Sequence, residues 1–241
     1  MSARILSCGE QALTVELGQS VDESVNRRVI ALAQALQINP VPGVLETVPT
    51  YRSLLVRFDP EVTRGAAMKE MLQDRLNGLT EGLDLAPGRL WRLPVAYGGS
   101  TGMDLRDLAA DKDLSADALI AMHSAATYRV YMIGFSPGFA YLGGLPRKLH
   151  TPRLVTPRQL IPEGAIGIGG QQANINSIAG PSGWRFIGWT PVRIFDPDRA
   201  EPFLLCAGDR VQFEPVSPEQ AADVAARQVA GETVMQPEDA S

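Results

Sequence analysis

Several features that mark common protein classes are scarce or absent in this sequence. Only two cysteines occur among 241 residues, too few for a disulfide framework, and we expect Cys8 and Cys206 to be buried free thiols. Acidic residues outnumber basic ones, the formal net charge is -5, and no basic run is present, so nucleic acid and anionic membranes are not expected partners. We find no signal peptide and no uninterrupted run of about eighteen apolar residues, which predicts a cytoplasmic protein without a membrane span.

Motifs for self-sufficient catalysis are also missing. The glycine-rich stretches do not end in Gly-Lys-Ser or Gly-Lys-Thr, so they do not form a recognisable P-loop. His, Cys and carboxylate side chains are not grouped at metal-ligand spacing, and no Ser-His-Asp motif can be recognised. The chain is therefore not expected to be a hydrolase on its own. If ATP and Mg²⁺ are used, their site would be built with a partner or in another subunit.

The first part of the chain has the pattern of a small domain that mixes helices and strands. Apolar periodicity and turn residues predict strands within 3–17, a helix from the N-cap Asp22 to Pro40, a hairpin of 44–48 and 53–58, and a helix over 63–77 that stops at Gly78. We expect the inward face of the last helix to consist of Ala67, Met71, Leu72 and Leu76. Residues 1–88 are therefore predicted to form an N-terminal α+β domain.

The polar stretch 78–88 is the best candidate boundary, and the chain after it changes character. A strand over 90–97 and helices over 104–108 and 115–125, the latter capped by Ser115, are followed mainly by short strands between turn residues. These strands are expected at 165–168, 173–175, 184–187, 192–195 and 210–213. Their number and shortness predict a closed or nearly closed β-barrel over residues 89–216. Residues 217–241 are expected to give one or two helical turns and a frayed tail.

One dense block, Tyr131 to Pro146, is unusually rich in glycine, proline and aromatic residues. Glycine permits close approach of the backbone and proline fixes it, so this block is neither a helix nor an ordinary alternating strand. Its glycines and flat side chains are suited to one wall of a ligand site. The alternative is that the aromatic side chains plug the barrel and an interface with a partner. The candidate ligand-binding residues in the block are Phe135, Pro137, Gly138 and Tyr141.

Charged and titratable candidates lie on both sides of that block. Arg153 and Arg158 each follow a proline, and their planar guanidinium groups suit carboxylate or phosphate oxygens, although bonding loop carbonyls is an equal alternative. His123 could move a proton near neutral pH, whereas a lone histidine at a helix end more often bonds a carbonyl. We assign a structural role to the remaining histidine, His150. Gln171 opens a polar cluster and is a further candidate for binding the substrate.

From Leu93 to Val216 the chain resembles the family of the B subunit of bacterial 5-oxoprolinase. This family also includes the Kip-type inhibitor of a sporulation kinase and the first subunit of allophanate hydrolase, with relatives in urea carboxylase. The matching segments occur in the family's order and spacing. They are 93–99, His123-Ser124, 131–146, Pro152-Arg153, Pro157-Arg158, 161–168, Gly170-Gln171, Gly183-Trp184, Gly188, Thr190-Pro191, Phe195-Asp196 and Gly208-Asp209.

The resemblance implies an α+β fold in which a small N-terminal domain precedes a cyclophilin-like β-barrel. It also implies a subunit that acts with a homologous C subunit and a third subunit to open the lactam 5-oxoproline to glutamate, driven by ATP with Mg²⁺ in the assembled complex. In this reading His123, Arg153 and Arg158 are catalytic, and Phe135, Pro137, Gly138, Tyr141 and Gln171 contact the substrate. Two alternatives remain: a carboxyltransferase-like subunit of a urea carboxylase or allophanate hydrolase system, and a Kip-type inhibitor that binds a histidine kinase.

The chain departs from the family's usual pattern at three places, one of which is Gly180-Pro-Ser-Gly-Trp184 in place of Pro-Gly-Gly-Trp. After Gly170-Gln171 it continues with Gln172 to Ser177 in place of the usual Thr-Gly-(aromatic or Ile)-Tyr-Pro, and Trp189 stands where arginine is common. Loss of that tyrosine and arginine leaves the identity of the amide or lactam substrate open.

Overall fold

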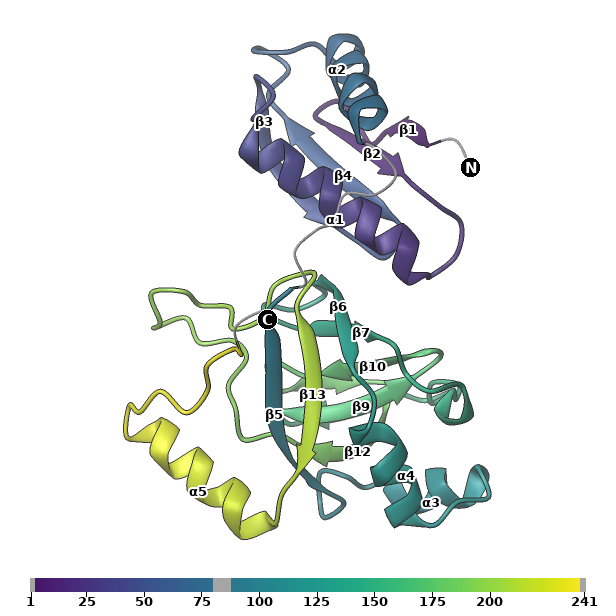
Figure 1. Ribbon diagram of the computed structural model, residues 1–241, viewed down its shortest axis with the longest axis vertical. Coiled ribbons are helices and arrows are strands. Elements are labelled where there is room, and N and C mark those ends of the chain that lie inside the picture. Colours follow the sequence, from purple (N-terminus) through teal and green to yellow (C-terminus); the bar gives the residue numbers. More distant parts are fainter. Residues whose placement is uncertain (1–2, 80–87, 239–241) are drawn as a thin grey trace. The chain divides into compact units, whose positions relative to one another are not determined.

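The computed structural model describes residues 3–79 and 88–238. The chain forms two compact units, Met1–Ala86 and Pro87–Ser241 (Figure 1). Both helices and strands occur in each unit, which confirms the predicted mixture of helices and strands. No helix among the described residues has the length and apolar character needed to cross a membrane.

The N-terminal unit is a four-stranded antiparallel sheet with two helices. The strands lie in the order β1-β2-β4-β3, with β1 at Arg4–Ser7, β2 at Ala12–Glu16, β3 at Val44–Pro49 and β4 at Ser53–Phe58. The helices are α1 at Glu23–Ile38 and α2 at Gly65–Gly78, and both pack on the sheet. The hairpin of β3 and β4 confirms the prediction from the sequence.

Local chemistry explains where the helices of this unit begin and which faces they bury. The carboxylate of Asp22 accepts from the backbone amides of Ser24 at 2.9 Å and Val25 at 3.3 Å, as expected of an N-cap. In α2 the buried side chains are Met68 and Leu72. The prediction was wrong for Ala67, which is exposed, because the helix is rotated so that Met68 takes the central inward position.

The C-terminal unit is built around a closed barrel of seven strands in the order β10-β7-β6-β13-β5-β12-β9 (Figure 1). This confirms the expected barrel. The long strands β5 and β13 run parallel to each other, whereas the other neighbouring strands of the barrel pair antiparallel. The strands are β5 Leu90–Tyr97, β6 Tyr128–Ile133, β7 Ala140–Gly143, β9 Ala165–Gly169, β10 Gln172–Ile175, β12 Arg185–Trp189 and β13 Arg210–Pro215.

Smaller elements decorate this barrel. Helix α3 at Leu105–Asp111 packs on α4 at Ala116–Ser124, and α4 begins after Ser115, whose hydroxyl accepts from the amide of Ala118 as the sequence predicts. A short 3₁₀ helix, η1, spans Arg147–Leu149. Strands β8 at Arg158–Ile161 and β11 at Gly180–Ser182 form a two-stranded sheet outside the barrel.

The structure corrects four further expectations from the sequence. Helix α5 spans Pro218–Val229, longer than one or two turns, because Ser217 and Gln220 form a capping box at its start. Residues 192–195 form no strand, and only Phe195 makes an isolated bridge, to Phe203. The block from Tyr131 contains the end of β6 and all of β7, so ordinary strands occupy part of it.

The fourth correction concerns both cysteines. Cys8 and Cys206 are exposed rather than buried. Cys8 directly follows the last residue of β1, and Cys206 begins a tight turn in which its carbonyl accepts from the amide of Asp209. Both thiols therefore lie just outside the segments whose apolar character suggested burial.

Candidate functional site

The dense block of glycine, proline and aromatic residues forms one side of a surface pocket of about 260 Å³, called here the aromatic pocket. Three segments converge on it: the connection from β6 together with β7, the stretch that leads into β8, and the residues from β11 up to the start of β12. Its lining residues are Phe135, Phe139, Tyr141, Arg153, Pro157, Pro181, Ser182, Gly183 and Trp184. The pocket thus combines flat apolar surface with one cation.

The aromatic side chains of this pocket pack on one another. The ring centroid of Phe139 lies 4.7 Å from that of Tyr141 and 6.4 Å from that of Trp184, and both Phe139 and Trp184 are almost fully buried. Phe135 continues the cluster at 5.7 Å from Phe139 but is 79% exposed, at a positive φ of 72°. That backbone conformation costs a non-glycine residue about 1–3 kcal/mol, so the exposed position of this apolar ring lowers the stability of the fold by about that amount.

Arg153 supplies the positive charge of the aromatic pocket. Its guanidinium carbon lies 4.5 Å from the ring centroid of Trp184, a cation–π contact. None of the ion pairs found among the described residues involves Arg153. Gly169 makes the contact possible, because a Cβ there would lie 2.8 Å from the Trp184 ring and 3.0 Å from the Cγ of Arg153. The cation therefore lies over an aromatic face without a counterion among the described residues.

Arg158, the second arginine predicted to bind a carboxylate or phosphate, is not among the lining residues of the aromatic pocket. Its Nη2 and Nη1 donate to the two carboxylate oxygens of Asp104 at 2.6 Å and 2.9 Å. The Asp104 side chain is 8% exposed, and it also accepts from the backbone amide of Phe186 at 2.7 Å. The guanidinium of Arg158 is thus already neutralised by a carboxylate of the same chain, and its role as an anion clamp stays a prediction.

His123, the predicted proton shuttle, lies in the interior of the barrel unit and not at the aromatic pocket. Its ring stacks at 4.8 Å on Phe213, and its Nδ1 lies 2.8 Å from the hydroxyl of Tyr97. Burial lowers the pKa of His123 to about 3, so the imidazole is neutral near neutral pH. Its Nε2 has no hydrogen-bond partner among the described residues. A catalytic role for His123 stays a prediction.

The contact of His123 with Tyr97 connects it to a surface hollow. Tyr97 lines a groove of about 560 Å³ formed with Gly98, Gly99 and residues of α3 and α4. This groove and the aromatic pocket share no lining residue. His150, for which a structural role was predicted, places its Nε2 3.0 Å from the carbonyl oxygen of Leu145.

The other predicted contact residues, Pro137, Gly138 and Gln171, are not among the lining residues of the aromatic pocket. Pro137 is exposed and Gly138 is buried, with a positive φ of 75° that suits glycine. A Cβ on Gly138 would lie 2.6 Å from the Cβ of Phe195, so the turn that presents Phe135 needs glycine here. Gln171 is exposed between β9 and β10, and Asn174 and its neighbours are buried in the barrel wall.

Sequence reasoning did not name Ser182 and Trp184 as site residues. Trp184 provides both the buried base of the pocket and the platform for Arg153. The Gly183-Trp184 pair was noticed as a motif, and a tryptophan within reach of an unpaired arginine is the signal that could have identified it.

The sequence was compared with protein families and curated proteins. It matches the family described as carboxyltransferase domain, subdomain C and D, over residues 3–205. A protein of Bacillus subtilis strain 168, named as the B subunit of 5-oxoprolinase, is 36% identical over 224 residues, 89% of this chain and 93% of the relative. Its namesake from Escherichia coli O157:H7 is 40% identical over 213 residues, 88% and 96% of the two chains. A urea amidolyase from Lachancea kluyveri is 22% identical, and this chain covers 13% of its length.

Solved structures give the same picture of the fold. A conserved uncharacterised protein from Pyrococcus horikoshii is 38% identical with a TM-score of 0.54, and the match covers 90% of this chain and 99% of that one. The protein TTHA0988 is 36% identical with a TM-score of 0.76, and this chain covers 40% of its length. The urea amidolyase of K. lactis has a TM-score of 0.81 at 21% identity, over 98% of this chain and 16% of that one, which shows a shared fold.

Proposed function

The chain belongs to the family of carboxyltransferase domains, subdomain C and D, and from that membership we propose that it is the B subunit of an ATP-dependent 5-oxoprolinase. One observation carries the proposal. Relatives that are named as the B subunit of 5-oxoprolinase are 36% and 40% identical to it and align over nearly their whole length. The proposed reaction opens the lactam of 5-oxoproline to glutamate, in the cytoplasm, within a complex of several subunits.

The chemistry of the aromatic pocket suits this substrate. 5-Oxoproline is a small five-membered ring that bears one carboxylate, so it needs a flat apolar surface and a single cation. Phe139, Tyr141 and Trp184 offer the surface, and Arg153 offers an unpaired guanidinium beside it. In the proposal Arg153 holds the carboxylate while the lactam ring lies against the aromatic side chains. The pocket volume of about 260 Å³ leaves room for a molecule of this size.

Lactam opening needs an activated carbonyl. We propose that the γ-phosphoryl group of ATP is transferred to the amide oxygen, which releases ADP, and that water then adds to the activated carbon. The C–N bond breaks as its nitrogen takes up a proton, phosphate leaves, and glutamate remains. The part of the chain that the structure describes holds no group of three His, Cys, Asp or Glu side chains that could bind a metal ion. The proposal therefore assigns ATP and Mg²⁺ to the assembled complex.

Exposed apolar side chains beside the aromatic pocket support a partner surface. Phe135 is 79% exposed on the rim, Val155 between Arg153 and Pro157 is fully exposed, and Leu160 in β8 is 70% exposed. Exposed apolar side chains that lie close together on a protein surface usually mark an interface, and Val155 and Leu160 lie two and three positions from the lining residue Pro157 in the sequence. We propose that they are covered by a homologous C subunit, which closes the pocket, and that a third subunit is needed to complete the enzyme.

The direct experiment co-expresses this chain with the proteins encoded by the neighbouring genes and measures ADP release that depends on 5-oxoproline. The proposal expects activity from the assembled complex and little from any preparation that lacks this chain. A matched preparation with Arg153→Ala should assemble and show at least a tenfold lower rate, because a charged hydrogen bond is worth about 1.5–3 kcal/mol. Full activity in the absence of this chain would contradict the proposal.

A second candidate is a subunit of a urea carboxylase or urea amidolyase system. The family match to a carboxyltransferase domain and the aligned urea amidolyase of Lachancea kluyveri support it. The same complex would be tested with urea, bicarbonate and a biotinylated carrier protein in place of 5-oxoproline. ADP release that requires urea and the carrier, with none on 5-oxoproline, would select this second function.

A further inference from the structure

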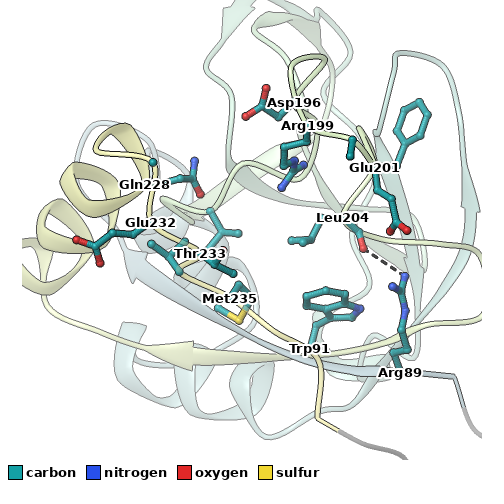
Figure 2. Close-up of a pocket in the computed structure, with 15 residues that line it drawn as sticks. Arg89, Trp91, Asp196, Arg199, Glu201, Leu204, Gln228, Glu232, Thr233 and Met235 are labelled. Carbon is teal, nitrogen blue, oxygen red and sulfur yellow. Dashed lines mark hydrogen bonds between the residues drawn. The ribbon is translucent and has the colours of Figure 1, made fainter.

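The C-terminal unit has a second cavity, of about 470 Å³, called here the tail pocket (Figure 2). It lies between the start of β5, the loop over residues 192–204, the end of α5 and residues 231–235. It shares no lining residue with the aromatic pocket or with the groove at Tyr97. Neither the proposed reaction nor the residues selected from the sequence use this cavity.

One side of the tail pocket is apolar. Trp91 and Val192 are almost completely buried and belong to the core of the barrel, and Leu204 and Met235 pack against the same core. Figure 2 shows Trp91, Leu204 and Met235 grouped along the same side of the cavity. A ligand that enters would therefore bury apolar surface on this floor.

The acidic residues around the tail pocket are directed elsewhere. Glu232 pairs with Arg227 at 2.8 Å, and Asp196 lies 4.0 Å from Arg193. In Figure 2 the carboxylates of Glu232 and Asp196 point outward from the ring of lining residues. Glu201 places its carboxylate on the side of Arg89. The centre of the cavity is therefore not occupied by a negative charge of the protein.

The two lining arginines differ in how their charge is compensated. Arg89 donates to both carboxylate oxygens of the buried Asp209, at 3.1 Å and 2.7 Å, and its charge is thereby matched. Arg199 donates from Nη2 to the carbonyl oxygen of Pro202 at 3.0 Å, while its Nε is buried without an acceptor among the described residues. None of the ion pairs found in the described part of the chain includes Arg199, and Figure 2 shows its guanidinium pointing into the cavity.

We propose that the tail pocket binds a small organic monocarboxylate, whose carboxylate pairs with Arg199 and whose apolar body packs on Trp91 and Met235. A partly buried cation without a counterion is costly, and a bound carboxylate compensates it with charged hydrogen bonds. Of the lining charges, those of Arg89, Asp196 and Glu232 are matched by partners at 2.7–4.0 Å, so Arg199 is left with one positive charge that has no counterion among the described residues. A single negative charge fits such a lining, whereas a phosphate or nucleotide with two or more charges carries more than this cation can match.

The experiment uses the full chain in the Arg153→Ala background, so that the carboxylate site proposed for the aromatic pocket cannot contribute. Calorimetric titration with benzoate is compared with titration with benzamide, which has the same shape without the charge, and with inorganic phosphate. Saturable benzoate binding is expected, with benzamide and phosphate at least tenfold weaker. Failure of benzoate to saturate by about 10 mM would overturn the proposal.

Two variants locate the binding site. Arg199→Gln removes the cation. Thr233→Glu adds a carboxylate to the lining at an exposed position, where we expect little effect on the stability of the fold. Each should weaken benzoate binding at least tenfold, and Arg147→Gln, the same loss of charge at an exposed arginine outside the lining, should leave it unchanged. Benzoate binding that survives both Arg199→Gln and Thr233→Glu would place the ligand elsewhere and refute the assignment. Loss of 5-oxoprolinase activity has no bearing on this test.

Discussion

Replacing Arg158 by alanine leaves the carboxylate of Asp104 inside the barrel unit without its ion-pair partner. That carboxylate is 8% exposed and accepts two hydrogen bonds from Arg158, at 2.6 Å and 2.9 Å, and one from the amide of Phe186 at 2.7 Å. The hydrogen bond from the Phe186 amide connects Asp104 to β12, and Arg158 is the first residue of β8. The carboxylate of Asp104 therefore joins the loop before α3 to two different sheets.

The magnitude follows from this geometry. Removing one partner of a buried ion pair costs about 3–5 kcal/mol. Arg158 is 30% exposed, and Asp104 keeps its hydrogen bond from the Phe186 amide. We therefore expect a smaller loss of unfolding free energy, about 2–4 kcal/mol. For a protein of this size that corresponds to a fall of about 5–15 °C in the melting temperature.

Calorimetry or urea denaturation of the purified chain measures this loss. Arg153→Ala is the matched control, because Arg153 also follows a proline but stacks on Trp184 without an ion pair among the described residues. We expect Arg153→Ala to change the stability by less than about 1 kcal/mol. A double-mutant cycle with Asp104→Asn isolates the pairwise energy. An unchanged melting temperature for Arg158→Ala would refute the structural role and return Arg158 to the candidates for binding an anion.

Two further predictions concern stability. Burial lowers the pKa of His123 to about 3, against about 6.5 in the unfolded chain, so only the unfolded state takes up this proton between those values and stability falls as the pH drops below about 6.5. From pH 7 to pH 5 the wild type should lose about 2 kcal/mol more than His123→Phe in urea titrations, and equal losses would contradict the burial of a neutral imidazole. Asp22→Ala removes the N-cap of α1 and should cost about 1 kcal/mol, measured as a lower urea midpoint of the N-terminal unit, whereas exposed Glu10→Ala should not.

Signals that act over a few residues were read correctly from the sequence. The caps at Asp22 and Ser115 depend on a side chain and the amides two or three positions later, so they are visible without tertiary structure. The short strands between turn residues predicted the closed barrel. Phe135 and Tyr141, which stand in a segment dense in glycine and proline, line the aromatic pocket, and their contact with a substrate stays a prediction.

Properties that depend on distant partners could not be read in this way. Asp104 is 54 positions before Arg158 in the sequence, and nothing local shows that the two side chains pair. His123 is of a residue type that can carry protons near neutral pH, but its ring is buried and stacks on Phe213 in the barrel interior. The tail pocket brings together Trp91 and Met235, from opposite ends of the C-terminal unit, so no local sequence motif predicts it.

The central claim is that this chain is a required subunit of a 5-oxoprolinase. The most direct test measures ADP release by the co-purified complex with and without 5-oxoproline, beside the same preparation lacking this chain. The account predicts that ADP release depends on both 5-oxoproline and this chain and that glutamate forms in equal amount. A complex that contains this chain, binds its neighbours and yet releases no ADP in response to 5-oxoproline would contradict it.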